Sequence, residues 1–133
     1  MRSARDRVLF CAALFIMGTL MAFSSIGQER QGRVQMLVQN SPLAGFRHAE
    51  AADAWPDLRQ GDELTLVREP DNAFDKNAVR VEWRGRKLGY VPRRENSALA
   101  WALDRGETLR ARVSRCEWHP NPARRIAFQV FVE

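Results

Sequence analysis

The sequence predicts a small, mostly β domain, and three observations carry this prediction. From Val34 onward, apolar and polar residues alternate in short runs separated by turn residues, which is the pattern of half-buried strands. No repeat with a period of about 20–50 residues and no low-complexity tract interrupts these runs. The chain has 133 residues, 45% of them hydrophobic, which is enough for the core of one domain over residues 28–133.

The first half of this domain contains three predicted strands. Residues 34–38 are expected to form the first, ended by the turn residues Asn40, Ser41 and Pro42. Residues 43–60 are rich in alanine and acidic side chains, so we expect one short helix or an irregular crossing there. Residues 63–68 form the second strand and residues 78–83 the third, with Val79, Val81 and Trp83 on one face.

A hairpin, a helix and two long strands complete the prediction. Arg84-Gly85 is a two-residue hairpin turn into a strand over residues 87–91. A helix is predicted over residues 95–105, with Ala98, Leu99, Ala102 and Leu103 on its apolar face and Gly106 as its stop. Residues 108–118 and 126–132 are the last strands, joined by a turn at residues 119–122. Phe131 falls on the polar face of the last strand and is expected to be an exposed aromatic.

The N-terminal residues have the features of an export signal. Three arginines, Arg2, Arg5 and Arg7, precede an uncharged run over residues 8–26 that ends in small residues. Cleavage after Ser24 or Gly27 gives a periplasmic domain, whereas an uncleaved run of this length anchors the domain in the inner membrane, facing outward. Residues 1–27 are therefore interpreted as a signal peptide or membrane anchor. In a third alternative, translation starts at Met36.

The charge pattern favours an anionic partner. The chain carries a formal net charge of +5, and residues 84–133 hold eleven basic and five acidic side chains, so the C-terminal half is basic. Such a surface suits a phosphate backbone or an acidic membrane. The alternative explanation is that the preference for arginine over lysine reflects genome base composition.

Several chemistries find no support in the sequence. The two cysteines and two histidines are far apart, and Cys11 lies in the leading apolar run, so neither a disulfide framework nor a zinc site is predicted. The residues Asp71, Asn72, Asp75 and Asn77 lack calcium-loop spacing and are better explained as turn caps. No phosphate loop or nucleophile motif is present. We therefore predict no cofactor, no metal and no enzymatic activity.

The central part of the chain resembles a known family. Residues 68–79 match the pattern Arg-Glu-Pro-x-Asn-x-aromatic-Asp-x-Asn-Ala-Val, followed by Gly-Tyr-Val-Pro-Arg at residues 89–93, Leu-Ala at residues 99–100 and Gly106. With residues 41–48 upstream, this combination resembles the HIRAN domain over about residues 34–132. The module occurs in eukaryotic DNA-repair helicases and in small bacterial proteins. The resemblance implies an OB-like, six-stranded β-barrel with one or two short helices.

The resemblance also implies a function, because HIRAN domains of repair enzymes bind single-stranded DNA at its free 3′ end. The family's aromatic-Asp pair falls on Phe74, which would stack on the terminal base, and on Asp75, which would accept a hydrogen bond from the 3′ hydroxyl. Further binding positions fall on Arg47, His48, Tyr90 and Arg93, and phosphates would be neutralised by Arg47, Arg93 and Arg94.

Two positions have more than one interpretation from the residue pattern alone. Phe74 is either a buried core residue or an exposed platform, and Asp75 is a turn cap, a ligand contact or both. Export separates the protein from cellular DNA, so the alternative function is an envelope interaction domain. It would use the same groove for a protein or for an anionic glycan or lipid, and would touch a membrane only through residues 8–26, if these remain uncleaved.

Overall fold

A computed structural model of the chain describes residues 35–48 and 50–133. These described residues belong to one compact unit. The predicted signal peptide or anchor, residues 1–27, lies outside the described residues. Within the described part of the chain, no helix is long and apolar enough to cross a membrane.

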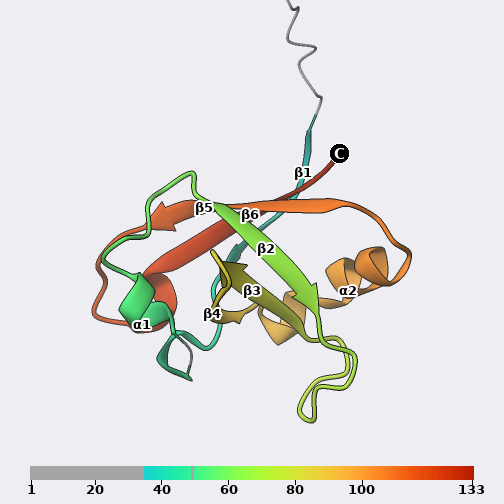
Figure 1. Ribbon diagram of the computed structural model, residues 1–133, viewed down its shortest axis with the longest axis horizontal. Helices are drawn as coiled ribbons and strands as arrows, with labels where there is room; N and C mark the ends of the chain where they lie inside the picture. The colour runs from blue at the N-terminus through green and yellow to red at the C-terminus, as the bar shows by residue number, and fades with distance from the viewer. Residues whose placement is uncertain (1–34, 49) are drawn as a thin grey trace, which may run out of the picture. The chain divides into compact units, whose positions relative to one another are not determined.

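The unit is built on one six-stranded antiparallel sheet (Figure 1). Its strands are β1 (Met36–Pro42), β2 (Glu63–Arg68), β3 (Val79–Trp83), β4 (Arg86–Tyr90), β5 (Leu109–Cys116) and β6 (Ile126–Val132). They lie in the order β1-β6-β5-β2-β3-β4. The mostly β fold class is therefore confirmed.

The described residues also form two α-helices and three short 3-10 helices. The α-helices are α1 (Ala51–Ala54), which packs against β4, and α2 (Ser97–Asp104), which contacts β2. The 3-10 helices are η1 (Phe46–His48), η2 (Arg93–Glu95) and η3 (Pro122–Arg124). α1 and α2 lie at opposite ends of the sheet in Figure 1.

The expected closed barrel is wrong, because the two edge strands β1 and β4 do not pair. Between these edges, the described residues form one isolated bridge, in which Ala44 and Tyr90 exchange two backbone hydrogen bonds of 2.9 Å. The chain turns away at Gly45, whose φ of +78° is in the left-handed region that favours glycine, and enters η1. Pairing therefore stops after one residue, and the sheet stays open.

The bridge depends on a close approach at Gly89. A Cβ atom at this position would lie 2.1 Å from the carbonyl oxygen of Ala44, far inside van der Waals contact. Only glycine allows the two backbones to meet here. The bridge in turn fixes the backbone of Tyr90, the next residue along β4.

The core follows the predicted alternation in the central strands. In β3, Val79, Val81 and Trp83 are buried while the residues between them are partly exposed, and in β5 Ala111 and Val113 are buried. The loop between β3 and β4 is the predicted Arg84-Gly85 turn. Both residues have positive φ, 50° and 77°, as a two-residue hairpin of the type I′ family requires.

Three local predictions are wrong, each for a physical reason. β1 continues through Asn40 to Pro42, because an edge strand tolerates a proline that donates no hydrogen bond. Phe131 is buried, since the guanidinium of Arg112 covers its ring at 4.4 Å. The α-helix begins at Ser97 instead of residue 95, and its buried alanines are Ala100 and Ala102, whereas Ala98 is exposed.

Candidate functional site

A pocket of about 430 Å³ brings together four of the six residues predicted for the site. Phe74 and Asp75 enter it from the loop between β2 and β3, Tyr90 from the end of β4, and Arg93 from η2. Two segments that are far apart in sequence, residues 74–75 and residues 90–93, therefore converge on one hollow. The remaining lining residues are Ala44, Gly45, Asn72, Ala78, Lys87 and Val91.

Side-chain caps give the loop that carries Phe74 its shape. The Asn72 Oδ1 atom accepts hydrogen bonds from the backbone N–H groups of Phe74 at 2.9 Å and Asp75 at 3.1 Å, and Asp75 Oδ1 accepts from Asn77 N–H at 2.9 Å. These are Asx turns, as predicted, and they account for the cluster of Asp and Asn residues. The side chain of Phe74 is 87% exposed, which excludes a core role.

Asp75 is both a turn cap and a charged group at the pocket. Its Oδ2 atom accepts a 2.6 Å hydrogen bond from the side-chain amide of Asn96, which is itself buried at the N-terminus of α2. Burial opposes ionisation, but the hydrogen bonds from Asn77 and Asn96 and the charges of Arg93 and Arg68 outweigh it, so the pKa of Asp75 lies below its ordinary value. Because each carboxylate oxygen has two acceptor positions, Asp75 keeps capacity for a ligand donor.

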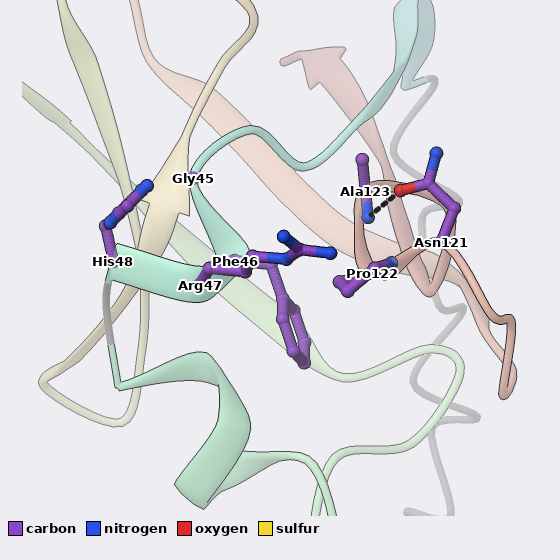
Figure 2. A pocket seen from close by; sticks show the side chains of 7 residues that line it. All are labelled: Gly45, Phe46, Arg47, His48, Asn121, Pro122 and Ala123. Atoms are coloured by element: carbon purple, nitrogen blue, oxygen red, sulfur yellow. Dashed lines mark hydrogen bonds between the residues drawn. The ribbon is translucent and has the colours of Figure 1, made fainter.

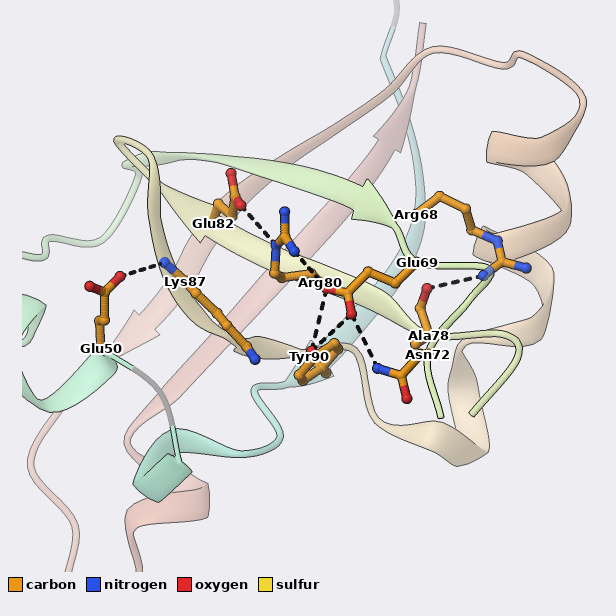
Figure 3. Close-up of polar contacts among 9 residues, drawn as sticks. All are labelled: Glu50, Arg68, Glu69, Asn72, Ala78, Arg80, Glu82, Lys87 and Tyr90. Carbon is orange, nitrogen blue, oxygen red and sulfur yellow. Dashed lines mark hydrogen bonds and ion pairs between the residues drawn. The ribbon is translucent and has the colours of Figure 1, made fainter. Parts of the chain in front are cut away.

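Hydrogen bonds fix both the backbone and the side-chain hydroxyl of Tyr90. Its backbone is fixed by the bridge to Ala44, and its hydroxyl donates to the Glu69 carboxylate at 3.0 Å (Figure 3). The Lys87 ammonium lies 4.6 Å from the centre of its ring, within the range of a cation–π contact. Tyr90 is thus a fixed aromatic surface with a cation beside it.

Arg47 and His48 lie next to this pocket instead of inside it. Both are exposed on η1 and line a second hollow of about 330 Å³, with Asn121, Pro122 and Ala123 on its other side. Figure 2 shows Arg47 extending toward Pro122 of η3, while the side chain of His48 points in a different direction. The two hollows share Gly45, so they adjoin.

The charge at these hollows is mostly positive and unpaired. Arg47, Lys87 and Arg93 form no ion pair with any other residue that the structure describes. A neighbouring hollow of about 460 Å³ shares Phe74, Asp75 and Arg93 with the first and adds Lys76. Free cations beside an exposed aromatic ring form a surface that can take an anionic, ring-bearing ligand.

Sequence reasoning missed three residues that shape this region. Lys87 was assigned only to a strand, although its position three residues before Tyr90 carries a basic side chain to the same pocket. Asn96 and Glu69 act through side-chain contacts across 21 positions of sequence, with Asp75 and Tyr90 respectively. No local pattern indicates such contacts; for Glu69 the only signal is its place within the Arg-Glu-Pro motif.

Comparisons with known proteins agree on the kind of domain. A family model described as the HIRAN domain matches residues 36–133. A Fanconi-associated nuclease 1 homolog from Oryza sativa subsp. japonica is 42% identical over 73 residues, which cover 52% of this chain and only 7% of the rice protein.

Two solved structures share the fold. A crystal structure of a Lactobacillus plantarum protein aligns with a TM-score of 0.65 and 24% identity, covering 74% of this chain and 95% of that one. The HIRAN domain of human HLTF aligns with a TM-score of 0.55 and 19% identity, covering 73% and 78%. None of these comparisons supports the alternative of an envelope interaction domain.

Proposed function

Since the chain belongs to the HIRAN domain family, we propose that it is a non-enzymatic module that binds single-stranded nucleic acid at a free 3′ end. The observation that carries the proposal is the pocket shared by Phe74, Asp75, Tyr90 and Arg93. It places an exposed ring, a charged acceptor, a fixed ring and a free cation around one hollow. An aromatic ring can stack on a terminal base, a charged acceptor can bind its 3′ hydroxyl, and a cation can contact a phosphate.

The aromatic rings supply affinity that does not depend on base identity. Phe74 offers an open face to solvent, and a base that stacks on such a ring gains about 1–3 kcal/mol. Tyr90 cannot turn away from the pocket without breaking its hydrogen bond to Glu69. A base can therefore lodge against a surface that is already ordered, which lowers the entropic cost of binding.

Asp75 supplies the preference for a chain end. Its carboxylate is charged, because its pKa lies below the ordinary value. A free 3′ hydroxyl can donate a hydrogen bond to it, whereas a terminal or continuing phosphate brings a second negative charge against it. The same group that stabilises the loop thus distinguishes a free end from a blocked or internal position.

The unpaired cations supply contacts to the sugar-phosphate backbone. Arg93 and Lys87 lie at the pocket, and Arg47 lies at the adjoining hollow. Phosphates passing from one hollow to the next can be neutralised in turn, with release of counterions. We therefore expect the association constant to fall as salt concentration rises.

We assign no nuclease activity to this chain. The match to the rice protein spans 7% of that protein. The role proposed here is recognition, with no chemical step.

A comparison of linear and circular single strands tests the proposal. Fluorescence anisotropy is measured with a short linear DNA that has a free 3′ hydroxyl, and a circular single strand of the same sequence serves as the competitor. The proposal expects the linear strand to bind at least about tenfold more tightly, because only it has an end. Equal competition by the circle refutes end recognition, and absence of binding to either strand refutes the nucleic-acid function.

A further inference from the structure

We propose that Glu69 is a positioning residue, which holds the Tyr90 ring and the loop bearing Phe74 and Asp75 in one fixed arrangement. This inference rests on the proposed function, because it concerns how that site is ordered. Glu69 does not line the pocket and is not expected to touch the ligand. It acts through the residues that do.

Glu69 lies directly after β2 and joins three parts of the fold (Figure 3). Its carboxylate accepts hydrogen bonds from the Tyr90 hydroxyl at 3.0 Å, from the side-chain amide of Asn72 at 3.1 Å and from the Arg80 guanidinium at 2.8 Å. Tyr90 belongs to β4, Asn72 to the loop and Arg80 to β3. One side chain therefore ties the pocket's strand to the pocket's loop.

The connection continues from Asn72 into the loop backbone. While its amide group donates to Glu69, the Oδ1 atom of Asn72 accepts the N–H groups of Phe74 and Asp75. A continuous path of hydrogen bonds thus runs from the Tyr90 hydroxyl to the backbone of the two residues proposed to read the end. Losing the central carboxylate frees both ends of this path.

The charge of Glu69 makes a positioning role distinguishable from a direct electrostatic one. Burial disfavours its ionisation, but hydrogen bonds from Asn72 and Tyr90 and the charge of Arg80 outweigh that cost, so the pKa of Glu69 lies below its ordinary value. A fixed negative charge close to the pocket repels a polyanion. If Glu69 affects binding only through charge repulsion, removing its charge should strengthen nucleic-acid binding. If Glu69 acts by holding Tyr90 and the loop in place, removing its charge should weaken binding.

Two matched variants distinguish these two effects, because the effects change the affinity in opposite directions. Glu69→Gln keeps the size of the side chain but replaces one acceptor oxygen with an NH2 group. Because the charged Arg80 guanidinium favours the remaining oxygen, the new NH2 group faces the Asn72 amide, and the hydrogen bond from Asn72 is lost. Glu82→Gln is the control, because Glu82 accepts a hydrogen bond from the same guanidinium at 2.8 Å but forms none with Tyr90 or Asn72, both of which the structure describes. We expect Glu69→Gln to bind the 3′-hydroxyl strand about five- to tenfold more weakly. Glu82→Gln should bind equally or more tightly.

A double variant tests whether Glu69 acts through Tyr90. Tyr90→Phe keeps the ring and removes only the hydroxyl. If the two residues work as one unit, the double variant Glu69→Gln/Tyr90→Phe binds no more weakly than Glu69→Gln alone. Losses that add up in the double variant contradict the path through Tyr90.

Tyr90 also gives a readout that needs no ligand. It is the only tyrosine in the chain, so tyrosine-selective isotope labelling yields the NMR signals of a single ring. Glu69→Gln should shift these signals and the amide signals of Phe74 and Asp75, whereas Glu82→Gln should leave them in place. If the wild type binds no strand, the proposed function fails while these shifts still decide the positioning role. If the wild type binds and Glu69→Gln binds as tightly, the positioning role is refuted.

Discussion

Replacing Phe74 with alanine should reduce nucleic-acid binding and leave the fold almost unchanged. The side chain is 87% exposed, so folding removes only about 25 Å² of its roughly 200 Å² from water. At about 25 cal/mol per Å², that burial contributes about 0.6 kcal/mol to the free energy of unfolding. A buried phenylalanine would cost about 3–5 kcal/mol on the same replacement.

In Phe74→Ala, the loss of binding free energy should be larger than the loss of unfolding free energy. Stacking is worth about 1–3 kcal/mol, which corresponds to an affinity loss of about five- to 150-fold. Urea denaturation and an anisotropy titration of Phe74→Ala and the wild type measure the two quantities separately. Trp101→Ala is the control, because Trp101 is an exposed aromatic on α2 that lines none of the hollows described above. An unchanged affinity for Phe74→Ala, or an equal loss for Trp101→Ala, refutes the platform role.

Three further predictions concern the scaffold and the location. Gly89→Ala should lower the free energy of unfolding by about 2–4 kcal/mol, because the added Cβ meets the Ala44 carbonyl oxygen. Gly85→Ala is the control and should lower it by only about 1 kcal/mol, because the space around Gly85 is open. Similar urea midpoints for the two variants would contradict this prediction. Folding lowers the pKa of Asp75 and of Glu69, so each stabilises the fold above its unfolded pKa, near 4, and this stability is lost as pH falls through the folded pKa. The free energy of unfolding, measured in urea from about pH 6 to about pH 3, should therefore change less with pH in Asp75→Asn/Glu69→Gln than in the wild type. Equal changes in the two proteins would refute the lowered pKa values. Finally, intact-mass measurement of periplasmic protein should show loss of about the first 24–27 residues, and full-length protein in the soluble cytoplasm would refute export.

The strands were predictable because each is specified by its own residues. In β3 the alternation of Val79, Val81 and Trp83 fixes which face is buried, and the Arg84-Gly85 pair fixes the hairpin that follows. Phe131 shows where this reasoning stops. Alternation places it on the polar face of β6, but that face is covered by Arg112 from the neighbouring strand, which the local pattern does not reveal.

The site was predictable in its residue types and less so in its arrangement. The Asn72 and Asp75 caps follow from short-range turn chemistry and were expected. The roles of Glu69 and Asn96 depend on contacts with partners 21 positions away. Such contacts exist only once the sheet has formed, because the bridge at Ala44 and the start of α2 bring their partners within reach.

The central claim is that this domain recognises a free 3′ end through Asp75. It is tested most directly by the ratio of dissociation constants for two single strands that differ only in a 3′ hydroxyl or a 3′ phosphate. The wild type should bind the hydroxyl strand about tenfold or more tightly, because the added phosphate meets the Asp75 charge. In Asp75→Asn, checked by urea denaturation to be folded, the ratio should approach one. Equal affinity of the wild type for both strands would contradict the account.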